Sequence, residues 1–137
     1  MKHSSIPKPT DAELAILRVL WERGPSTVRQ VYEVAAANRE LVYTTTLKLL
    51  QIMTEKGLVT RQEQERTHIY HAAHAEGAMQ KKLVNDLLDR AFSGSTAKLV
   101  MQVLATKAAS GDELREIQAL ITSYAEKEKN RGSHRKR

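Results

Sequence analysis

Residues 43–57 read YTTTLKLLQIMTEKG, and this stretch decides the fold that the sequence predicts. Its less polar side chains recur at the spacing of one helical face: Thr46, Leu49, Leu50 and Met53. Thr44 can cap the first turn of such a helix, and Gly57 is suited to end it. The opposite face is short, polar and singly positive: Thr44, Thr45, Lys48, Gln51 and Ile52. Such a helix can enter a DNA major groove, although an ordinary amphipathic surface helix has the same pattern.

Two further helices are predicted before this stretch. Thr10 and Glu13 have the spacing of a capping box, which predicts a helix that begins between them. Thr27 and Gln30 repeat that spacing and open a second helix, whose apolar stripe comprises Val28, Val31, Tyr32 and Ala35. Residues 38–40, Asn-Arg-Glu, interrupt this pattern before the helix at 43–57.

After Gly57 the sequence changes from a helical to a strand pattern. Residues 58–62 and 67–71 are short runs that contain Val, Thr, Ile and Tyr, and polar residues 63–66 lie between them. We predict a β-hairpin with Arg66 at its tip. Three helices followed by a hairpin is the order of a winged helix-turn-helix, in which the hairpin is the wing.

Residues 74–126 predict three more helices, with Ser95 and Ser110 as caps of the last two. Three short amphipathic helices cannot bury all their apolar faces against one another. Pairing with a second copy of the chain is the simplest way to cover them, and packing onto the N-terminal domain is the alternative. The side chains predicted to make the dimer are Leu83, Leu87, Val103, Leu104, Ile117, Leu120 and Ile121.

These patterns predict a mainly α fold, with a winged helix-turn-helix domain followed by a small three-helix dimerisation domain. The predicted divisions are a flexible arm at 1–9, the winged-helix domain at 10–73, the dimerisation domain at 74–126 and a basic tail at 127–137. The tail holds six Lys and Arg residues and one Glu, so it contributes most of the net charge of +6. It favours binding to a polyanion, although a solvated, disordered end has the same composition.

Composition and motifs exclude several classes of protein. The chain has no cysteine, which excludes disulfides, thiolate zinc sites and thiol nucleophiles. It has no apolar run as long as a membrane span, and its N-terminus is too polar for a secretory signal, so we expect a cytoplasmic protein. No Ser-His-Asp grouping, P-loop or dinucleotide motif is present, so we expect neither an enzyme nor a small-molecule substrate.

Three histidines invite a metal site because they are spaced by three: His68, His71 and His74. The first two lie in a predicted strand, where residues three apart point to opposite faces. We therefore expect no metal ion and no cofactor.

Three stretches carry a resemblance to a known family: PTDAELAILRVLWERGPSTVRQVYE, YTTTLKLLQIMTEKGLVTR and ERTHIYHA. They resemble the BlaI/MecI-type penicillinase repressors, which are bacterial winged-helix transcriptional repressors, and the resemblance covers roughly residues 8–127. It implies a homodimer that binds a palindromic operator through its N-terminal domains and regulates antibiotic resistance. It also implies a membrane-bound sensor protease that cleaves the repressor within the dimerisation region.

The chain departs from the family at positions that matter for DNA and for cleavage. Thr44 stands where some members have a DNA-contacting Lys, and Leu47 aligns with an Arg, whereas Thr45 is kept and Lys48 aligns with the next contact residue. The scissile bond would fall between Gln102 and Val103, which are not the Asn-Phe pair that the resemblance calls for. The copper-responsive branch of the family binds metal through C-terminal cysteines, and this chain has none.

Two functions follow from the sequence. The first is a DNA-binding repressor, whose predicted contact residues lie on the third helix and the wing: Tyr43, Thr44, Thr45, Lys48, Gln51, Arg61 and Arg66. The alternative is a winged-helix protein-interaction module that does not bind DNA, which the near-neutral charge of residues 1–126 favours.

Overall fold

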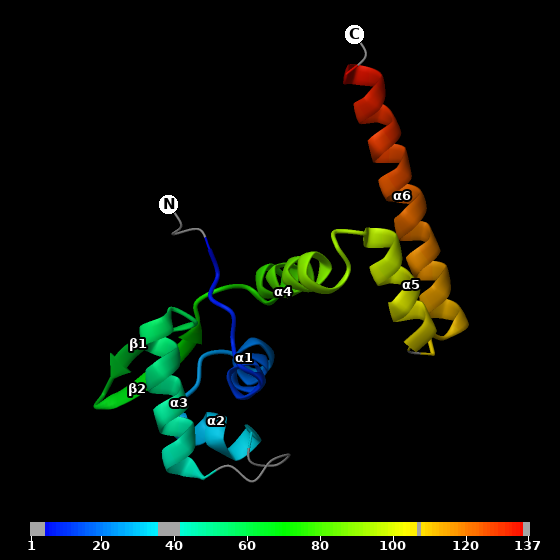
Figure 1. Ribbon diagram of the computed structural model, residues 1–137. Helices are drawn as coiled ribbons and strands as arrows, with labels where there is room; N and C mark the ends of the chain where they lie inside the picture. The colour runs from blue at the N-terminus through cyan, green and yellow to red at the C-terminus, as the bar shows by residue number, and fades with distance from the viewer. Residues whose placement is uncertain (1–4, 36–41, 107, 136–137) are drawn as a thin grey trace. The chain divides into compact units, whose positions relative to one another are not determined.

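The structure of the chain is a computed structural model that describes residues 5–35, 42–106 and 108–135 (Figure 1). The elements follow one another as α1 Asp11–Arg23, α2 Val28–Ala35, α3 Tyr43–Lys56, β1 Val59–Gln64, β2 Thr67–Ala72, α4 Glu76–Ala91, α5 Thr96–Thr106 and α6 Gly111–Arg135. Two compact units divide the chain, Met1–Leu87 and Leu88–Arg137. Within the described ranges, no helix combines the length and the apolar character that crossing a bilayer requires.

Reciprocal capping fixes where α1 and α2 begin. The Thr10 hydroxyl accepts from the Glu13 N–H at 3.2 Å, and the Glu13 carboxylate accepts from the Thr10 N–H at 2.8 Å. Thr27 and Gln30 form the same pair of bonds at the start of α2, at 3.2 and 2.9 Å. Each bond satisfies a backbone N–H that has no partner inside the helix, and both predicted caps are confirmed.

The start of α3 differs from its prediction, whereas its end does not. Val42 is the N-cap residue and provides no side-chain cap, so the prediction that Thr44 caps this helix was wrong. Thr44 lies one residue inside the helix, past the position at which a hydroxyl can reach the first free N–H groups. Gly57 ends α3 in the left-handed conformation, with φ of 87°. The interruption predicted at residues 38–40 lies outside the described residues.

The wing is longer and its turn tighter than the sequence predicted. Gln64 pairs with Thr67, so the turn consists of Glu65 and Arg66 alone, with φ of 50° and 70°. A two-residue turn with both φ values positive matches the twist of a hairpin, and this lets the ladder continue to the tip. The base of the wing is joined to the α1–α2 connection, where Ser26 forms an isolated antiparallel bridge with Tyr70.

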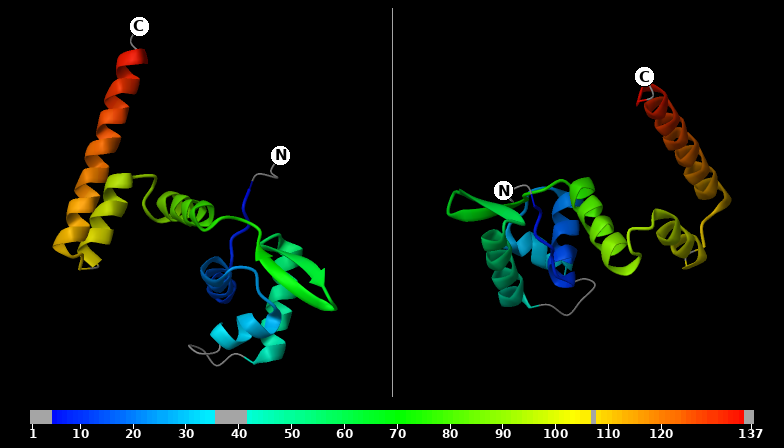
Figure 2. Two further views of the ribbon diagram at one scale, coloured as in Figure 1. Left: turned by 180° about the vertical axis from the view of Figure 1, so that it is seen from behind. Right: turned by 45° about the horizontal axis from the view of Figure 1, so that its top comes forward.

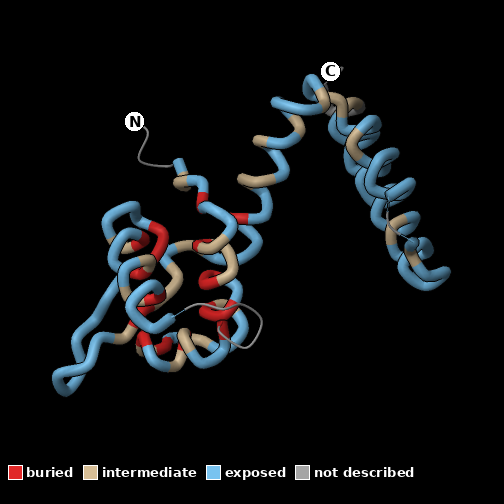
Figure 3. The backbone as a smooth tube through the Cα atoms, turned by 60° about the horizontal axis from the view of Figure 1, so that its bottom comes forward, coloured by how far each residue is buried: buried red, intermediate tan, exposed pale blue. Residues whose placement is uncertain are grey.

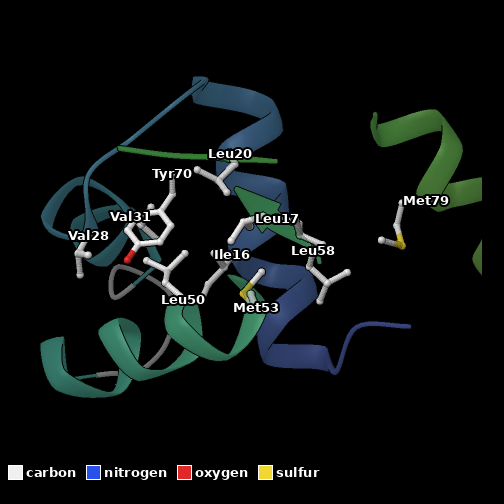
Figure 4. Packing of buried hydrophobic residues seen from close by; sticks show 11 residues of the cluster. Ile16, Leu17, Leu20, Val28, Val31, Leu50, Met53, Leu58, Tyr70 and Met79 are labelled. Carbon is white, nitrogen blue, oxygen red and sulfur yellow. The ribbon is translucent and has the colours of Figure 1, made fainter. Parts of the chain in front are cut away.

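The core of the first unit gathers side chains from α1, α2, α3, the wing and α4 (Figure 4). Ile16 of α1, Leu50 and Met53 of α3 and Tyr70 of β2 are each at most 1% exposed. Figure 3 shows the buried residues concentrated in this unit. The mainly α, winged helix-turn-helix fold is therefore confirmed.

The first unit also extends beyond the predicted limits of the winged-helix domain. Met79 of α4 is buried in the core, and Leu83 packs against the same core. The first compact unit therefore ends at Leu87, whereas the predicted domain boundary lies between residues 73 and 74. The Trp21 indole N–H donates to the His74 carbonyl at 2.9 Å, which ties the connection before α4 to α1. At the other end, Ile6 packs against the core, although residues 1–9 were predicted to be a flexible arm.

The second unit consists of the end of α4 with α5 and α6 (Figures 1 and 2). Ser95 and Ser110 cap α5 and α6 through their hydroxyls, as predicted. None of its residues at 88–106 and 108–132 is buried. Helix α6 runs to Arg135, so it includes most of the segment predicted as a basic tail. The helix continues into this segment because residues 122–131 contain no proline or glycine that would end it.

Candidate nucleic-acid interface

Helix α3 has a polar outer face and a buried inner face, as the sequence predicted. Thr46, Leu50 and Met53 are buried against the core. The residues predicted to contact the major groove are all exposed: Thr44, Thr45, Lys48 and Gln51. The helix is therefore fixed from behind while hydroxyl, ammonium and amide groups remain available on its surface, and these groups can bond to base edges.

Tyr43 occupies the first turn of α3 and is packed between two residues of α2. Its ring meets the ring of Tyr32 edge to face, with 5.8 Å between the centroids. The Arg29 guanidinium lies 5.1 Å from the centroid of the Tyr43 ring. Tyr43 thus joins the two helices of the helix-turn-helix, and 37% of its surface stays exposed.

Arg29 is a functional candidate that the sequence analysis missed. It lies in the first turn of α2 and is exposed. It lies outside the apolar stripe of α2 and two residues after the Thr27 cap, at the N-terminal end of the helix. A positive charge at the N-terminal end of a helix interacts unfavourably with the helix dipole. Its presence there is therefore a sequence signal for a role other than helix stability.

The wing carries both predicted arginines on its surface. Arg66 is exposed at the tip, and Arg61 is exposed opposite the buried Tyr70 in the ladder. Glu63 and Glu65 lie on the same hairpin, so its charges are balanced. Arg61 and Arg66 can each bind a phosphate, but the hairpin as a whole produces no strong positive field.

The predicted histidine arrangement agrees with the ladder. His68 pairs with Glu63 and His71 with Thr60, which places the two imidazoles on opposite faces of the hairpin. His74 lies after β2, where its Nε2 is 3.2 Å from the Gly57 carbonyl oxygen. Among the described residues, no group of three or more His, Cys, Asp or Glu could hold a metal ion.

An ion pair between Lys56 and a buried carboxylate holds the C-terminal end of α3, and the sequence did not predict it. The Lys56 Nζ lies 2.7 Å from Oε1 of Glu13, whose side chain is 3% exposed. Burial raises the pKa of Glu13, but the hydrogen bonds from Lys56 and from the Thr10 backbone and the positive charge of Lys56 outweigh it, so the pKa is lowered below 4.5. The same carboxylate therefore caps α1 and anchors α3.

The residues predicted for the dimer fall into two groups. Leu83 is half-buried and packs against the core of the first unit, so only part of its side chain is free for the contact between chains that the sequence predicts. The others are exposed, apart from the half-buried Ile117: Leu87, Val103, Leu104, Leu120 and Ile121. Residues of α5 and α6 line an apolar groove in the second unit, among them Val100, Leu120, Ile121 and Tyr124.

The predicted cleavage site lies inside α5. Gln102 and Val103 are both exposed, and both lie within the helix at Thr96–Thr106. A protease binds an extended segment, so cleavage here requires local unwinding of α5.

Comparison with known proteins identifies relatives of this chain. The family model described as "Penicillinase repressor" matches residues 9–123. "Transcriptional regulator BlaI" of Mycobacterium tuberculosis strain H37Rv is 40% identical over 108 residues, which are 77% of this chain and 78% of that protein. "Penicillinase repressor" of Bacillus licheniformis is 21% identical over 124 residues, which are 90% of this chain and 97% of that protein.

Solved structures are also similar. The complex structure of hsRosR-S4 has a TM-score of 0.50 at 19% identity and covers 89% of this chain and 94% of its own, which supports the fold. The monomeric form of Bacillus licheniformis BlaI, in complex with the blaP half-operator, has a TM-score of 0.48 at 22% identity and covers 53% of this chain and 89% of its own. By the extent of the family match and the identity to the mycobacterial regulator, the chain belongs to the penicillinase repressor family.

Proposed function

We propose that the chain is a transcriptional repressor that binds a DNA operator through the polar face of α3 and through the wing. The observation that carries this proposal is the exposed row of Thr44, Thr45, Lys48 and Gln51 on a helix whose other face is buried. Family membership supports it, because the relatives are named as a transcriptional regulator and a penicillinase repressor. A function on DNA implies a cytoplasmic location and action by binding rather than by catalysis.

Base contacts and phosphate contacts have separate roles in this proposal. Lys48 lies in the middle of the exposed face of α3, so we assign it to a base edge. Arg61 and Arg66 lie on the wing, so we assign them to the DNA backbone or the minor groove. Base contacts determine sequence preference, whereas phosphate contacts determine salt dependence.

The proposal includes a homodimer that binds a palindromic operator. The apolar groove of the second unit supports it, because a face of this kind is normally covered by another protein surface. A two-fold dimer places two recognition helices about 34–36 Å apart, or a multiple of that distance. Binding to the second half-site is then intramolecular, which raises affinity by about 10²–10⁴-fold over a single domain.

Release by a sensor protease is the induction route that the family resemblance implies. A cut between Gln102 and Val103 would separate the end of α5 and all of α6 from the DNA-binding unit. Mass spectrometry after incubation with the sensor protease tests this route. Intact protein under conditions that induce the target genes would contradict it.

The DNA-binding proposal is tested by fluorescence anisotropy with a duplex from the chain's own upstream region and a shuffled duplex of equal length. We expect tighter binding to the first duplex, and we expect Lys48→Ala to reduce that preference by about 1–3 kcal/mol. Equal binding to both duplexes would exclude a sequence-specific repressor. No binding to either would favour the alternative, a winged-helix module that binds proteins.

A further inference from the structure

A hollow opens between the start of α2, the start of α3 and the wing. Residues from all three elements line it, among them Arg29, Tyr43, Arg66 and His68. Three of these side chains can donate hydrogen bonds from nitrogen, and no carboxylate is among the described residues that line it. A hollow with several nitrogen donors and no acid is suited to an anionic oxygen.

Thr27 and Val28 also line the hollow, and they stand at the start of α2. The start of a helix carries a partial positive charge, and the capping pair of α2 occupies only the N–H groups of Thr27 and Gln30, so this helix end adds to the attraction for an anion. The guanidinium of Arg29 stays near this positive end because the face of the Tyr43 ring attracts it.

We infer that this hollow holds one phosphate group of the DNA backbone, that Arg29 is its principal ligand, and that Tyr43 is a positioning residue for Arg29 rather than a reader of bases. The inference rests on the proposed function and deepens it. The edge-to-face contact with Tyr32 orients the Tyr43 ring and so helps to fix the plane over which the guanidinium lies. Arg66 and His68 reach the same hollow from the wing, so one phosphate links the wing to the helix-turn-helix.

The inference predicts how Arg29 and Tyr43 variants change the dependence of DNA affinity on salt. Each phosphate contact contributes about 0.9 to the slope of log affinity against log salt concentration. Arg29→Ala should reduce the magnitude of that slope by about 0.9 and weaken binding on the order of ten-fold, equally on the upstream and the shuffled duplex. Tyr43→Leu should give the same loss, because Arg29 is then no longer held. Arg18→Ala, which removes an exposed arginine of α1, is the control and should leave the slope unchanged.

The double variant separates positioning from independent contacts. If Tyr43 acts through Arg29, then Arg29→Ala combined with Tyr43→Leu is no weaker than either single variant. Tyr43→Phe keeps the ring face and should rescue the affinity and the slope that Tyr43→Leu loses. Circular dichroism verifies that each variant is folded, and Arg29→Ala tests the phosphate contact even if Tyr43→Leu does not fold.

Several outcomes would overturn the inference. They are an unchanged slope in Arg29→Ala, additive losses in the double variant, or a Tyr43→Phe variant as weak as Tyr43→Leu, which would assign the contact to the phenol hydroxyl. A parent chain that binds neither duplex would overturn the proposed function as well. A parent that binds while Arg29→Ala keeps its slope would overturn this inference alone.

Discussion

Leu50 in α3 is wholly buried, whereas Leu120 in α6 is 57% exposed, and this contrast holds for the two units as wholes. In the first unit, short helices, a hairpin and the start of α4 cover one another. In the second unit, α5 and α6 leave their apolar residues uncovered, including Met101, Val103 and Ile121. The first unit therefore covers its own apolar side chains, whereas those of the second stay exposed, and the proposed homodimer would supply a surface that covers them.

The strongest test of this contrast removes the second unit. Truncation after Leu87 keeps Met79 and Leu83 with the core that they complete, so the fragment should stay folded and monomeric. Its affinity for the operator should fall by about 10²–10⁴-fold, because binding to two half-sites is lost. Analytical ultracentrifugation and anisotropy measure both effects. A full chain that is monomeric at micromolar concentration would remove the basis for the dimer.

A pair of leucine variants sharpens the same contrast. Leu50→Ala should reduce the free energy of unfolding by about 2–5 kcal/mol at every protein concentration, because it leaves a cavity in a closed core. Leu120→Ala should instead weaken stability in a manner that depends on protein concentration, because in the proposed homodimer the contact that it removes lies between chains. Urea unfolding at a low and a high protein concentration distinguishes the two. Equal behaviour of both variants would mean that Leu120 is covered within its own chain.

The ion pair between Glu13 and Lys56 gives a smaller effect, confined to the first unit. Glu13→Ala should lower the free energy of unfolding by about 1.5–3 kcal/mol, because it removes a charged hydrogen bond to Lys56 and the carboxylate half of the α1 capping box. Glu22→Ala, at an exposed position of the same helix, should change it by less than about 0.5 kcal/mol. If the two variants were equally stable, the ion pair would contribute nothing.

The lowered pKa of Glu13 makes this contribution depend on pH. A carboxyl whose pKa is lower in the folded chain stabilises it above the ordinary value of 4.5, and the contribution is lost as pH falls through the folded pKa. Glu13→Gln has no such charge to titrate. It should therefore lose less stability than the parent when pH is lowered below 4.5, as measured by thermal unfolding.

The smallest effect concerns the turn of the wing. Glu65 and Arg66 both have positive φ, a conformation that asparagine and glycine adopt more readily. Glu65→Asn should stabilise the first unit by about 0.5–1 kcal/mol without altering Arg66. Glu63→Asn, in the extended part of β1, provides a control that should bring no gain. A destabilised Glu65→Asn variant would show that Glu65 makes a contact that compensates for its backbone.

Local signals in the sequence predicted the elements of the first unit well. The capping pairs act between residues three apart, and the stripe of α3 reflects helix geometry alone, so neither requires knowledge of distant segments. The pairing of Glu13 with Lys56 spans 43 residues and could not be read from spacing. Leu83 lies on the apolar stripe of its helix, but a stripe shows only which face is apolar and not which other segment covers that face. The tight turn was missed because Glu-Arg is not a pair that favours positive φ.

The predicted contact residues show the same division between local and tertiary information. An outward face of α3 follows from its stripe, and Thr44, Thr45, Lys48 and Gln51 are exposed as that stripe requires. The stacking of Arg29 on Tyr43 depends on how α2 crosses α3, which the sequence does not state. Whether these side chains meet DNA stays a prediction that the binding experiments address.

The presence of Met79 in the core has a consequence for synthesis on the ribosome. The helix-turn-helix is complete once α3 has emerged, but the side chains that close its core come later, from Leu58 to Met79. At a translation rate of about 5–20 residues per second, the apolar faces of α1 and α3 stay uncovered for roughly one to four seconds until these residues are synthesised. The nascent chain is therefore open to chaperones, proteases and other nascent copies until α4 has left the exit tunnel.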